Sequence, residues 1–255
     1  MRKINIPVTI EFGDAAIDAT ARVPDVQMRP ADLLPILFGF TDAMAALAIE
    51  GARREGRTVS CRAGCGACCR QVVPIAECEA LYLAELVDAM PPERRACVRQ
   101  RFCDALAELG KSLVATLRDT AALKDIEKRR ALHTRYFGRQ VPCPFLEDES
   151  CSIHEHRPTA CREYLVSSPP ENCRTPGPLT LRMISLPVKP SQILYCFGDG
   201  IGNETTRWVP LVLALDWAEA RRAEPQPVYD GPQMFRNFIA QVARWLKQRE
   251  TRGLN

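Results

Sequence analysis

Four cysteines within nine residues constrain this chain more than any other feature of its sequence. They are Cys61, Cys65, Cys68 and Cys69, with two glycines between them. Thiolates held this close repel one another unless a metal neutralises them, and ligand spacings of two and three residues let a short loop place several sulfurs around one centre. The stretch therefore predicts a soft-metal or iron-sulfur site.

The rest of the composition is that of a folded protein. A domain commonly takes about 100 to 200 residues, so the 255 residues suffice for one large domain or two closely packed ones. Residues 1–12 alternate apolar and polar side chains and lack the continuous apolar core of a secretory signal. We therefore expect a cytoplasmic protein whose twelve cysteines are reduced thiols and metal ligands, with a disulfide framework as the weaker alternative.

Charge and hydropathy argue against nucleic acid and membrane as partners. The formal net charge is +3 and aromatic residues make up 7%, with no run that interleaves aromatic and basic side chains. The apolar stretch at residues 208–218 contains Pro210 and Asp216 and is shorter than the ~20 residues that cross a bilayer. We expect another protein as the partner, and the sequence does not specify an oligomeric state.

Hydrophobic periodicity predicts a mainly α fold with a small β component. Residues 4–12 and 17–23 alternate as the two strands of an N-terminal hairpin. Apolar residues at helical spacing predict helices over 32–54, 75–90, 93–118, 123–136, 209–223 and 232–249, and residues 179–197 predict short edge strands. Pro74 is expected to begin the second helix. Three cysteines within these helices, Cys78, Cys97 and Cys103, are expected to pack in the core.

A second cysteine-rich region follows the central helices. Its cysteines are Cys143, Cys151, Cys161 and Cys173, in a stretch rich in turn residues. We expect three parts packed as one unit: residues 1–57 with the hairpin and first helix, residues 58–175 as a cysteine-cluster metal-binding domain with a helical insert, and residues 176–255 with the C-terminal strands and helices. The insert would bring the second cysteine group back to the first.

Eight thiols can complete two centres of four ligands each. Zinc and iron-sulfur clusters both accept four cysteines, so the count leaves a 4Fe-4S cluster and zinc, and one centre or two, as open alternatives. The neighbours Cys68 and Cys69 cannot easily face one small centre together, and we expect ligands from the two groups to interleave.

Four arginines stand beside these cysteines. Four thiolates around zinc or a cluster core leave a net charge of about −2, which buried guanidinium groups could offset. Arg157 and Arg162 are the better candidates for contact with such a cofactor, whereas Arg62 and Arg70 could equally be solvated. His154 and His156 are two residues apart and are expected to make hydrogen bonds or lie at the surface.

The combined pattern resembles a known bacterial family. Its parts are Cys-x3-Cys-x2-Cys-Cys from Cys61, Cys-Pro-Phe-Leu from Cys143, and Cys-x-Ile-x3-Arg-Pro-x2-Cys-Arg from Cys151 to Arg162. This is similar to the cysteine-cluster family described as a zinc- or iron-chelating domain, and the resemblance covers residues 58–175. The family commonly has a tyrosine where His154 stands here. The resemblance implies metal binding and names no reaction.

Three function classes remain. The first is an iron-sulfur protein with a redox or protein-modifying role, and the second is an interaction or assembly protein held together by structural zinc. The third is an enzyme that transfers methyl groups from S-adenosylmethionine, because Cys61-x3-Cys65-x2-Cys68 is also the spacing of radical S-adenosylmethionine enzymes. That family carries its loop in a partial (β/α) barrel, and no alternating series of strands and helices follows here. The sequence shows no acid-base pair that would make the protein an enzyme.

Overall fold

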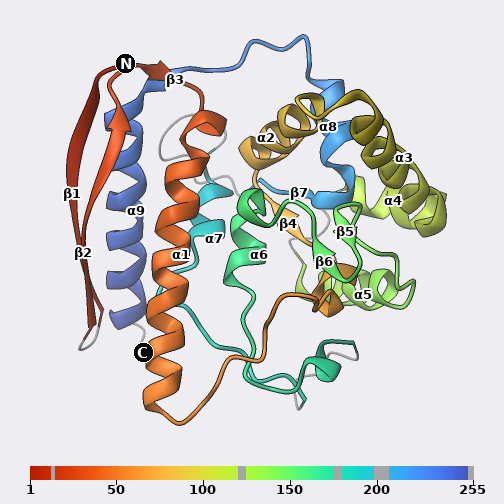
Figure 1. The fold of residues 1–255 in the computed structure, drawn as a ribbon, viewed down its shortest axis with the longest axis horizontal. Coiled ribbons are helices and arrows are strands. Elements are labelled where there is room, and N and C mark those ends of the chain that lie inside the picture. Colours follow the sequence, from red (N-terminus) through yellow and green to blue (C-terminus); the bar gives the residue numbers. More distant parts are fainter. Residues whose placement is uncertain (13–14, 120–124, 175–179, 198–206, 252–255) are drawn as a thin grey trace.

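The computed structural model describes residues 1–12, 15–119, 125–174, 180–197 and 207–251. It is mainly helical with a small β component, as the sequence predicts. Two bodies of helices lie side by side, and the segments that carry the cysteines run between and below them (Figure 1).

The N-terminal hairpin packs against helices from both ends of the chain. β1 (Lys3–Phe12) pairs antiparallel with β2 (Ala15–Pro24), which confirms the predicted hairpin, while its turn at 13–14 lies outside the described residues. Ile6, Val8 and Ile10 face inward onto α1 (Pro30–Arg54) and α9 (Gly231–Thr251), which stand beside the hairpin (Figure 1).

Helix α1 begins with Pro30, where a missing N–H costs no helical hydrogen bond. Its buried face includes Leu33, Leu37 and Met44, and the chain leaves it through Gly56, whose φ of 72° suits glycine. By length and composition α1 is apolar enough to cross a membrane, a test that the core helix of a globular domain also passes. The prediction of a helix at residues 32–54 is confirmed.

The helical insert differs from the prediction at two points. It consists of α2 (Glu77–Asp88), α3 (Pro92–Leu109), α4 (Lys111–Arg118) and α5 (Ile126–Phe137). The prediction of a single helix over residues 93–118 is wrong, because Gly110 adopts a φ of 77° and separates α3 from α4. Pro74 does not begin a helix: β4 (Pro74–Ile75) pairs with β7 (Val209–Pro210), and α2 starts after it.

The C-terminal region also differs from the secondary structure that the sequence predicts. The prediction of short edge strands over residues 179–197 is wrong for the described part of this range. Met183 forms an isolated bridge there, and the short helix α7 (Pro190–Leu194) follows it. The helix expected from 209 begins only at α8 (Ala214–Ala220), after β7 and a 3-10 turn at Leu211–Leu213. A further short pairing joins β3 (Gln27–Met28) to β8 (Tyr229–Asp230).

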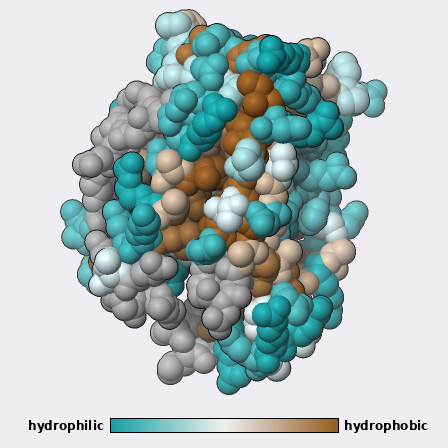
Figure 2. Space-filling model, turned by 90° about the vertical axis from the view of Figure 1, so that its left-hand side faces the viewer, coloured by the Kyte–Doolittle hydropathy of each residue, from teal (hydrophilic) through white to brown (hydrophobic). Residues whose placement is uncertain are grey.

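Two hydrophobic cores meet at α2. One contains the hairpin, α1, α7 and α9, and the other contains α3, α4, α5 and α8. Helix α2 contributes Cys78 to the first core, and Ala80 and Leu83 to the second. Cys78 is buried as expected, but the prediction for Cys97 and Cys103 is wrong, since both lie on the exposed side of α3. On the hairpin side of the molecule, a band of hydrophobic surface runs between hydrophilic margins (Figure 2).

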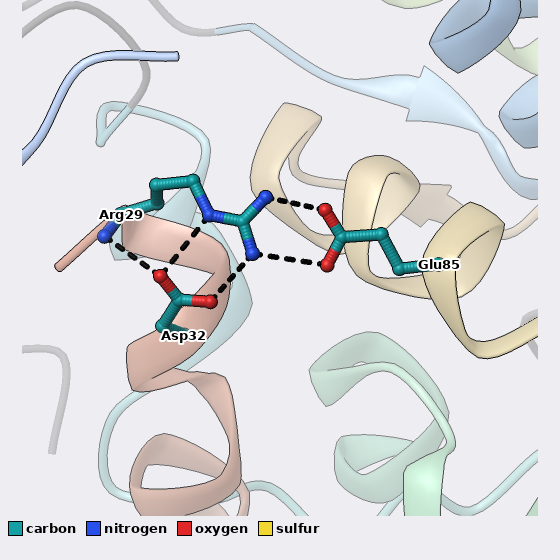
Figure 3. Close-up of polar contacts among 3 residues, drawn as sticks. All are labelled: Arg29, Asp32 and Glu85. Carbon is teal, nitrogen blue, oxygen red and sulfur yellow. Dashed lines mark hydrogen bonds and ion pairs between the residues drawn. The ribbon is translucent and has the colours of Figure 1, made fainter. Parts of the chain in front are cut away.

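Arg29 ties α1 to α2 across the junction of the two cores. Its guanidinium donates to both carboxylate oxygens of Asp32, at 2.6 and 3.1 Å, and to both carboxylate oxygens of Glu85 (Figure 3). Its backbone N–H donates to Asp32 at 2.9 Å and so caps α1. The hydrogen bonds from Arg29 lower the pKa of Asp32 below its ordinary range.

We expect Arg29→Met to lower the free energy of unfolding by about 1 kcal/mol, because the bridge is partly exposed and screened by water. The loss is present above the ordinary carboxyl pKa of about 4 and disappears as the pH falls through the lowered pKa of Asp32. Urea unfolding at pH 7 and pH 2 measures both effects. Arg53→Met, which breaks a more exposed pair with Glu50, is the control. An equal loss at both pH values would contradict the assignment.

Candidate metal centre

The first cysteine group lies in an irregular loop that ends in the 3-10 helix η1 (Ala67–Arg70). The Cys65 N–H donates to the Arg62 carbonyl at 3.3 Å, and the Cys69 N–H donates to the Gly66 carbonyl at 3.0 Å. Gly66 is buried, and a Cβ there would stand 2.6 Å from Leu146 Cδ1 and 2.8 Å from Glu149 Oε2. Glycine at this position therefore lets the second cysteine region approach the loop.

The second group meets the first through the backbone. The Cys143 N–H donates to the Cys69 carbonyl at 2.7 Å, and Cys151 pairs with Leu146 in the small hairpin of β5 (Leu146–Glu147) and β6 (Ser150–Cys151). Farther along, the Ser60 N–H donates to the Val166 carbonyl at 2.9 Å. The structure thus brings together two sequence regions that the helical insert separates.

An ion pair fastens the small hairpin to the loop. The Arg70 guanidinium donates to the Glu149 carboxylate at 2.6 and 3.2 Å and to the Gly66 carbonyl at 3.0 Å. Asp148 and Glu149 form the hairpin turn with φ values of 47° and 56°, a left-handed conformation that non-glycine residues seldom adopt. Arg70 therefore supports a strained turn next to Cys151, a role that the sequence did not indicate because Glu149 resembles any surface acid.

The thiols form one crowded group. All twelve cysteines are free, and burial raises the pKa of Cys143 to about 12 and that of Cys173 to about 11. Neighbouring thiols raise the pKa values further, since each thiolate would repel the next. The Cys69 thiol donates to Cys68, which lowers the pKa of Cys68 to about 7 and raises that of Cys69. Several of these sulfurs can be ionised together only beside a cation.

Arg157 supplies positive charge inside this group. Burial raises the pKa values of the Cys61 and Cys151 thiols, and the nearby Arg157 guanidinium offsets part of that rise; it also adds to the lowering of the Cys68 pKa that the Cys69 hydrogen bond causes. Its Nε is buried and has no hydrogen-bond partner in the described structure. An unpaired buried donor is costly, and an anionic centre among the thiols would provide the acceptor that it lacks. This orphaned donor is the feature of the structure that fits a metal-thiolate group.

Arg162 has a different environment. Its side chain is 5% exposed, donates to Asp42 of α1 at 2.6 Å, and lies over the Phe38 ring at 4.5 Å. It also donates to the backbone carbonyls of Arg157 at 2.8 Å and Glu155 at 2.5 Å. These contacts use the guanidinium to hold the segment that carries Arg157. Direct contact of Arg162 with a cofactor stays a prediction.

His154 and His156 lie as the sequence predicts, one exposed and the other hydrogen-bonded. The Tyr82 hydroxyl and His156 Nδ1 are hydrogen-bonded at 2.7 Å, and His154 is exposed. In the described parts of the chain, no three His, Cys, Asp or Glu side chains are arranged to hold one metal ion. The donors that crowd together are all thiols, which suit zinc or iron-sulfur chemistry. Ligation by the eight predicted cysteines remains a prediction.

Glu79 fixes the helix that carries Cys161. This carboxylate is 1% exposed and accepts from the Ala76 N–H at 2.8 Å, and from the N–H and hydroxyl of Thr159 at 2.7 and 2.8 Å. It therefore caps α2 and α6 (Thr159–Glu163) at once. In the sequence Glu79 is only an acidic residue in the first turn of a predicted helix. Nothing there indicates that it also caps α6.

We expect Glu79→Gln to lower the free energy of unfolding by about 2 to 4 kcal/mol. The new amide can accept with one atom only, so an N–H group of one helix end would face another donor. Glu93→Gln at an exposed first turn of α3 is the matched control and should change little. Chemical denaturation followed by circular dichroism measures both variants, and equal stabilities would contradict the double cap.

One comparison with known proteins matches the cysteine region. No curated protein and no solved structure matches the chain significantly. The sequence resemblance is confirmed by one family model, whose match begins one residue before Cys61 and ends three residues after Cys173. Residues 60–176 match the family CxxCxxCC, described as a "putative zinc- or iron-chelating domain".

Proposed function

We propose that residues 60–176 hold a cysteine-bound metal centre, and that a 4Fe-4S cluster with a redox or protein-modifying role is the group that suits it best. The observation that carries this proposal is the meeting of two distant cysteine groups near the half-buried side chain of Arg157, whose buried Nε has no hydrogen-bond partner among the described residues. Thiolates around iron are anionic, so the same group would satisfy the charge and the hydrogen bond of Arg157.

The described residues contain no ready-made site for a single ion. A tetrahedral zinc ion with bonds of about 2.3 Å holds its sulfurs about 3.8 Å apart. No three donor side chains among the described residues are arranged for one ion, yet the thiols of Cys143, Cys151 and Cys161 influence one another's charge. A 4Fe-4S cluster carries its cysteines outside the iron ions and therefore accepts a wider arrangement.

When bound, such a cluster supplies one-electron transfer. The residues of this chain would hold it, offset its charge and limit the access of water. Cys143 and Cys161 are desolvated by their surroundings, which raises their thiol pKa values and would keep a bound group in an apolar environment. Arg157 would donate a hydrogen bond from its buried Nε, and Arg162 would hold the backbone behind it.

Structural zinc is the second candidate. The thiols come from separate segments, namely the first loop with η1, the irregular stretch at Cys143 before β5, the strand β6, α6 and the 3-10 helix at Pro170–Arg174. A metal at their meeting point would fasten segments that share few helical contacts, as structural zinc does in small domains. This candidate needs no redox change and no substrate.

We expect protein purified without air to be brown and to contain iron and acid-labile sulfide in equal amounts, because a 4Fe-4S cluster contains both. Elemental analysis, sulfide determination and the visible spectrum measure this. Colourless protein with stoichiometric zinc would replace the cluster with structural zinc. Protein that binds neither metal, as purified or after anaerobic reconstitution, would contradict the proposal.

We expect Arg157→Met to lower the affinity for the metal about tenfold or more, since residues that support metal ligands commonly contribute 10-fold to 100-fold. Competition with a chelator measures the affinity, and Arg157→Lys should recover part of it by restoring the charge. Arg62→Met, at an exposed position in the first cysteine loop, is the matched control. Unchanged affinity in Arg157→Met with a folded protein would remove Arg157 from the site.

A further inference from the structure

A cavity of about 470 Å³ opens between α3 and the segment that leads into β5. Its volume lies within the range of about 300 to 1,000 Å³ that is common for binding pockets. The cavity belongs to the helical body that stands opposite the N-terminal hairpin (Figure 1). Cys143 lines it, so a molecule bound there would touch the segment that joins the two cysteine groups.

The charged side chains that line this cavity are mostly acidic. The carboxylates are those of Asp104, Glu108, Glu147 and Asp148, and the one cationic side chain is that of Arg101. Arg101 forms an ion pair with Glu147, and Glu147 also pairs with Arg94, which lies outside the lining. When both arginines are counted against the four carboxylates, the local charge is still about −2.

Three of the carboxylates have no opposite charge beside them. In the parts of the chain that the structure describes, Asp104, Glu108 and Asp148 form no ion pair. Asp104 accepts a hydrogen bond from the neutral amide of Gln100 at 2.8 Å. All three carboxylates belong to exposed residues at the mouth of the cavity. Because like charges around one cavity repel one another, a cationic partner would stabilise them.

The arrangement of these acids suits an extended cationic ligand and not a single ion. Among the described residues, no three donor side chains are placed to hold one metal ion. The deeper wall of the cavity is apolar and includes the buried residues Ala105, Val141 and Pro144. Lysine and arginine side chains combine an apolar stem with a cationic end, so they match an apolar wall beneath an acidic mouth.

We propose that this cavity, the α3–β5 groove, is a docking site for a basic surface segment of a partner protein. The unpaired carboxylates come from two segments of the chain, Asp104 and Glu108 from α3 and Asp148 from the turn after β5. A ligand that meets them all has to present several cationic groups across the groove, as a protein segment with several lysines or arginines does.

The attraction of a basic partner has to be local. The formal net charge of the whole chain is +3, so the protein as a whole repels a cationic protein. A partner held in the groove would lie against Cys143, beside the crowded thiols. The inference goes beyond the proposed metal centre, because none of the groove contacts depends on which metal the thiols bind.

The test is binding of a short synthetic peptide of alternating lysine and alanine to the full-length protein, followed by fluorescence anisotropy at low salt. Asp104→Asn/Glu108→Gln should lower the affinity about fivefold, because two exposed ion pairs are lost. Asp104→Lys/Glu108→Lys should remove measurable binding, because it places repulsive charges at the mouth of the groove. Glu11→Gln/Glu93→Gln neutralises two exposed acids outside the groove and is the matched control, with unchanged affinity expected.

Carbodiimide cross-linking locates the bound peptide independently of these variants. Its lysines should become joined to Asp104, Glu108 or Asp148, as mass spectrometry of the digested protein would show. Circular dichroism checks the fold of each variant. The metal content of each variant should equal that of the wild-type protein, because no cysteine is changed.

Three results would overturn the inference: no binding of the peptide by the wild-type protein, equal affinity in Asp104→Lys/Glu108→Lys, or cross-links only outside the groove. Spermidine that binds as tightly as the peptide would assign the groove to a free amine and would equally overturn a protein partner. Protein that contains no metal after anaerobic reconstitution and still binds the peptide in the groove would contradict the proposed function alone.

Discussion

Mutual repulsion among buried thiolates is the constraint on which this structure depends. The chain brings cysteines from distant segments into one region, where burial and neighbouring sulfurs raise the thiol pKa values of Cys143, Cys161 and Cys173. Only Arg157 brings an unpaired buried donor into that region among the described residues. A positively charged metal core is the group that would relieve the repulsion, because it bonds directly to the thiolates.

Three polar links hold the cysteine region in place. Arg29 joins α1 to Glu85 of α2, Glu79 joins α2 to the start of α6, and Arg162 joins α6 back to Asp42 of α1. The links form a closed triangle of helices, so α6 and its Cys161 cannot shift without breaking at least one of them. Because both residues of the Glu79–Thr159 link and the Arg162 side of the third link are buried, the triangle should be stiffer than surface ion pairs alone would make it.

Much of the fold could be predicted from the sequence because it depends on local patterns. The alternation of apolar and polar residues predicted the hairpin, and apolar residues at helical spacing predicted the bounds of α1 and α9 to within a few residues. The errors arose where tertiary contacts or a single backbone angle decide: Gly110 divides one periodic stretch, and Pro74 enters a short pairing with Pro210. Neither feature changes the hydrophobic pattern, so periodicity could not reveal it.

The site could be predicted only in part for a similar reason. Cysteine spacing indicates that the two groups belong together, but it contains nothing about which thiols are neighbours. That information lies in the backbone link between Cys69 and Cys143 and in the packing of Cys65 with Cys173. The different environments of Arg157 and Arg162 were equally hidden, since both arginines stand near cysteines in the sequence and only their hydrogen-bond partners in the folded chain tell them apart.

X-ray absorption at the metal edge tests the central claim most directly, because it reports the atoms bound to the metal in the intact protein. We expect a first shell of sulfur alone, at about 2.3 Å from the metal, since every donor in the crowded region is a thiol. A short metal-metal distance in the same spectrum would identify the cluster. A first shell that contains nitrogen or oxygen from the protein would contradict an all-cysteine centre.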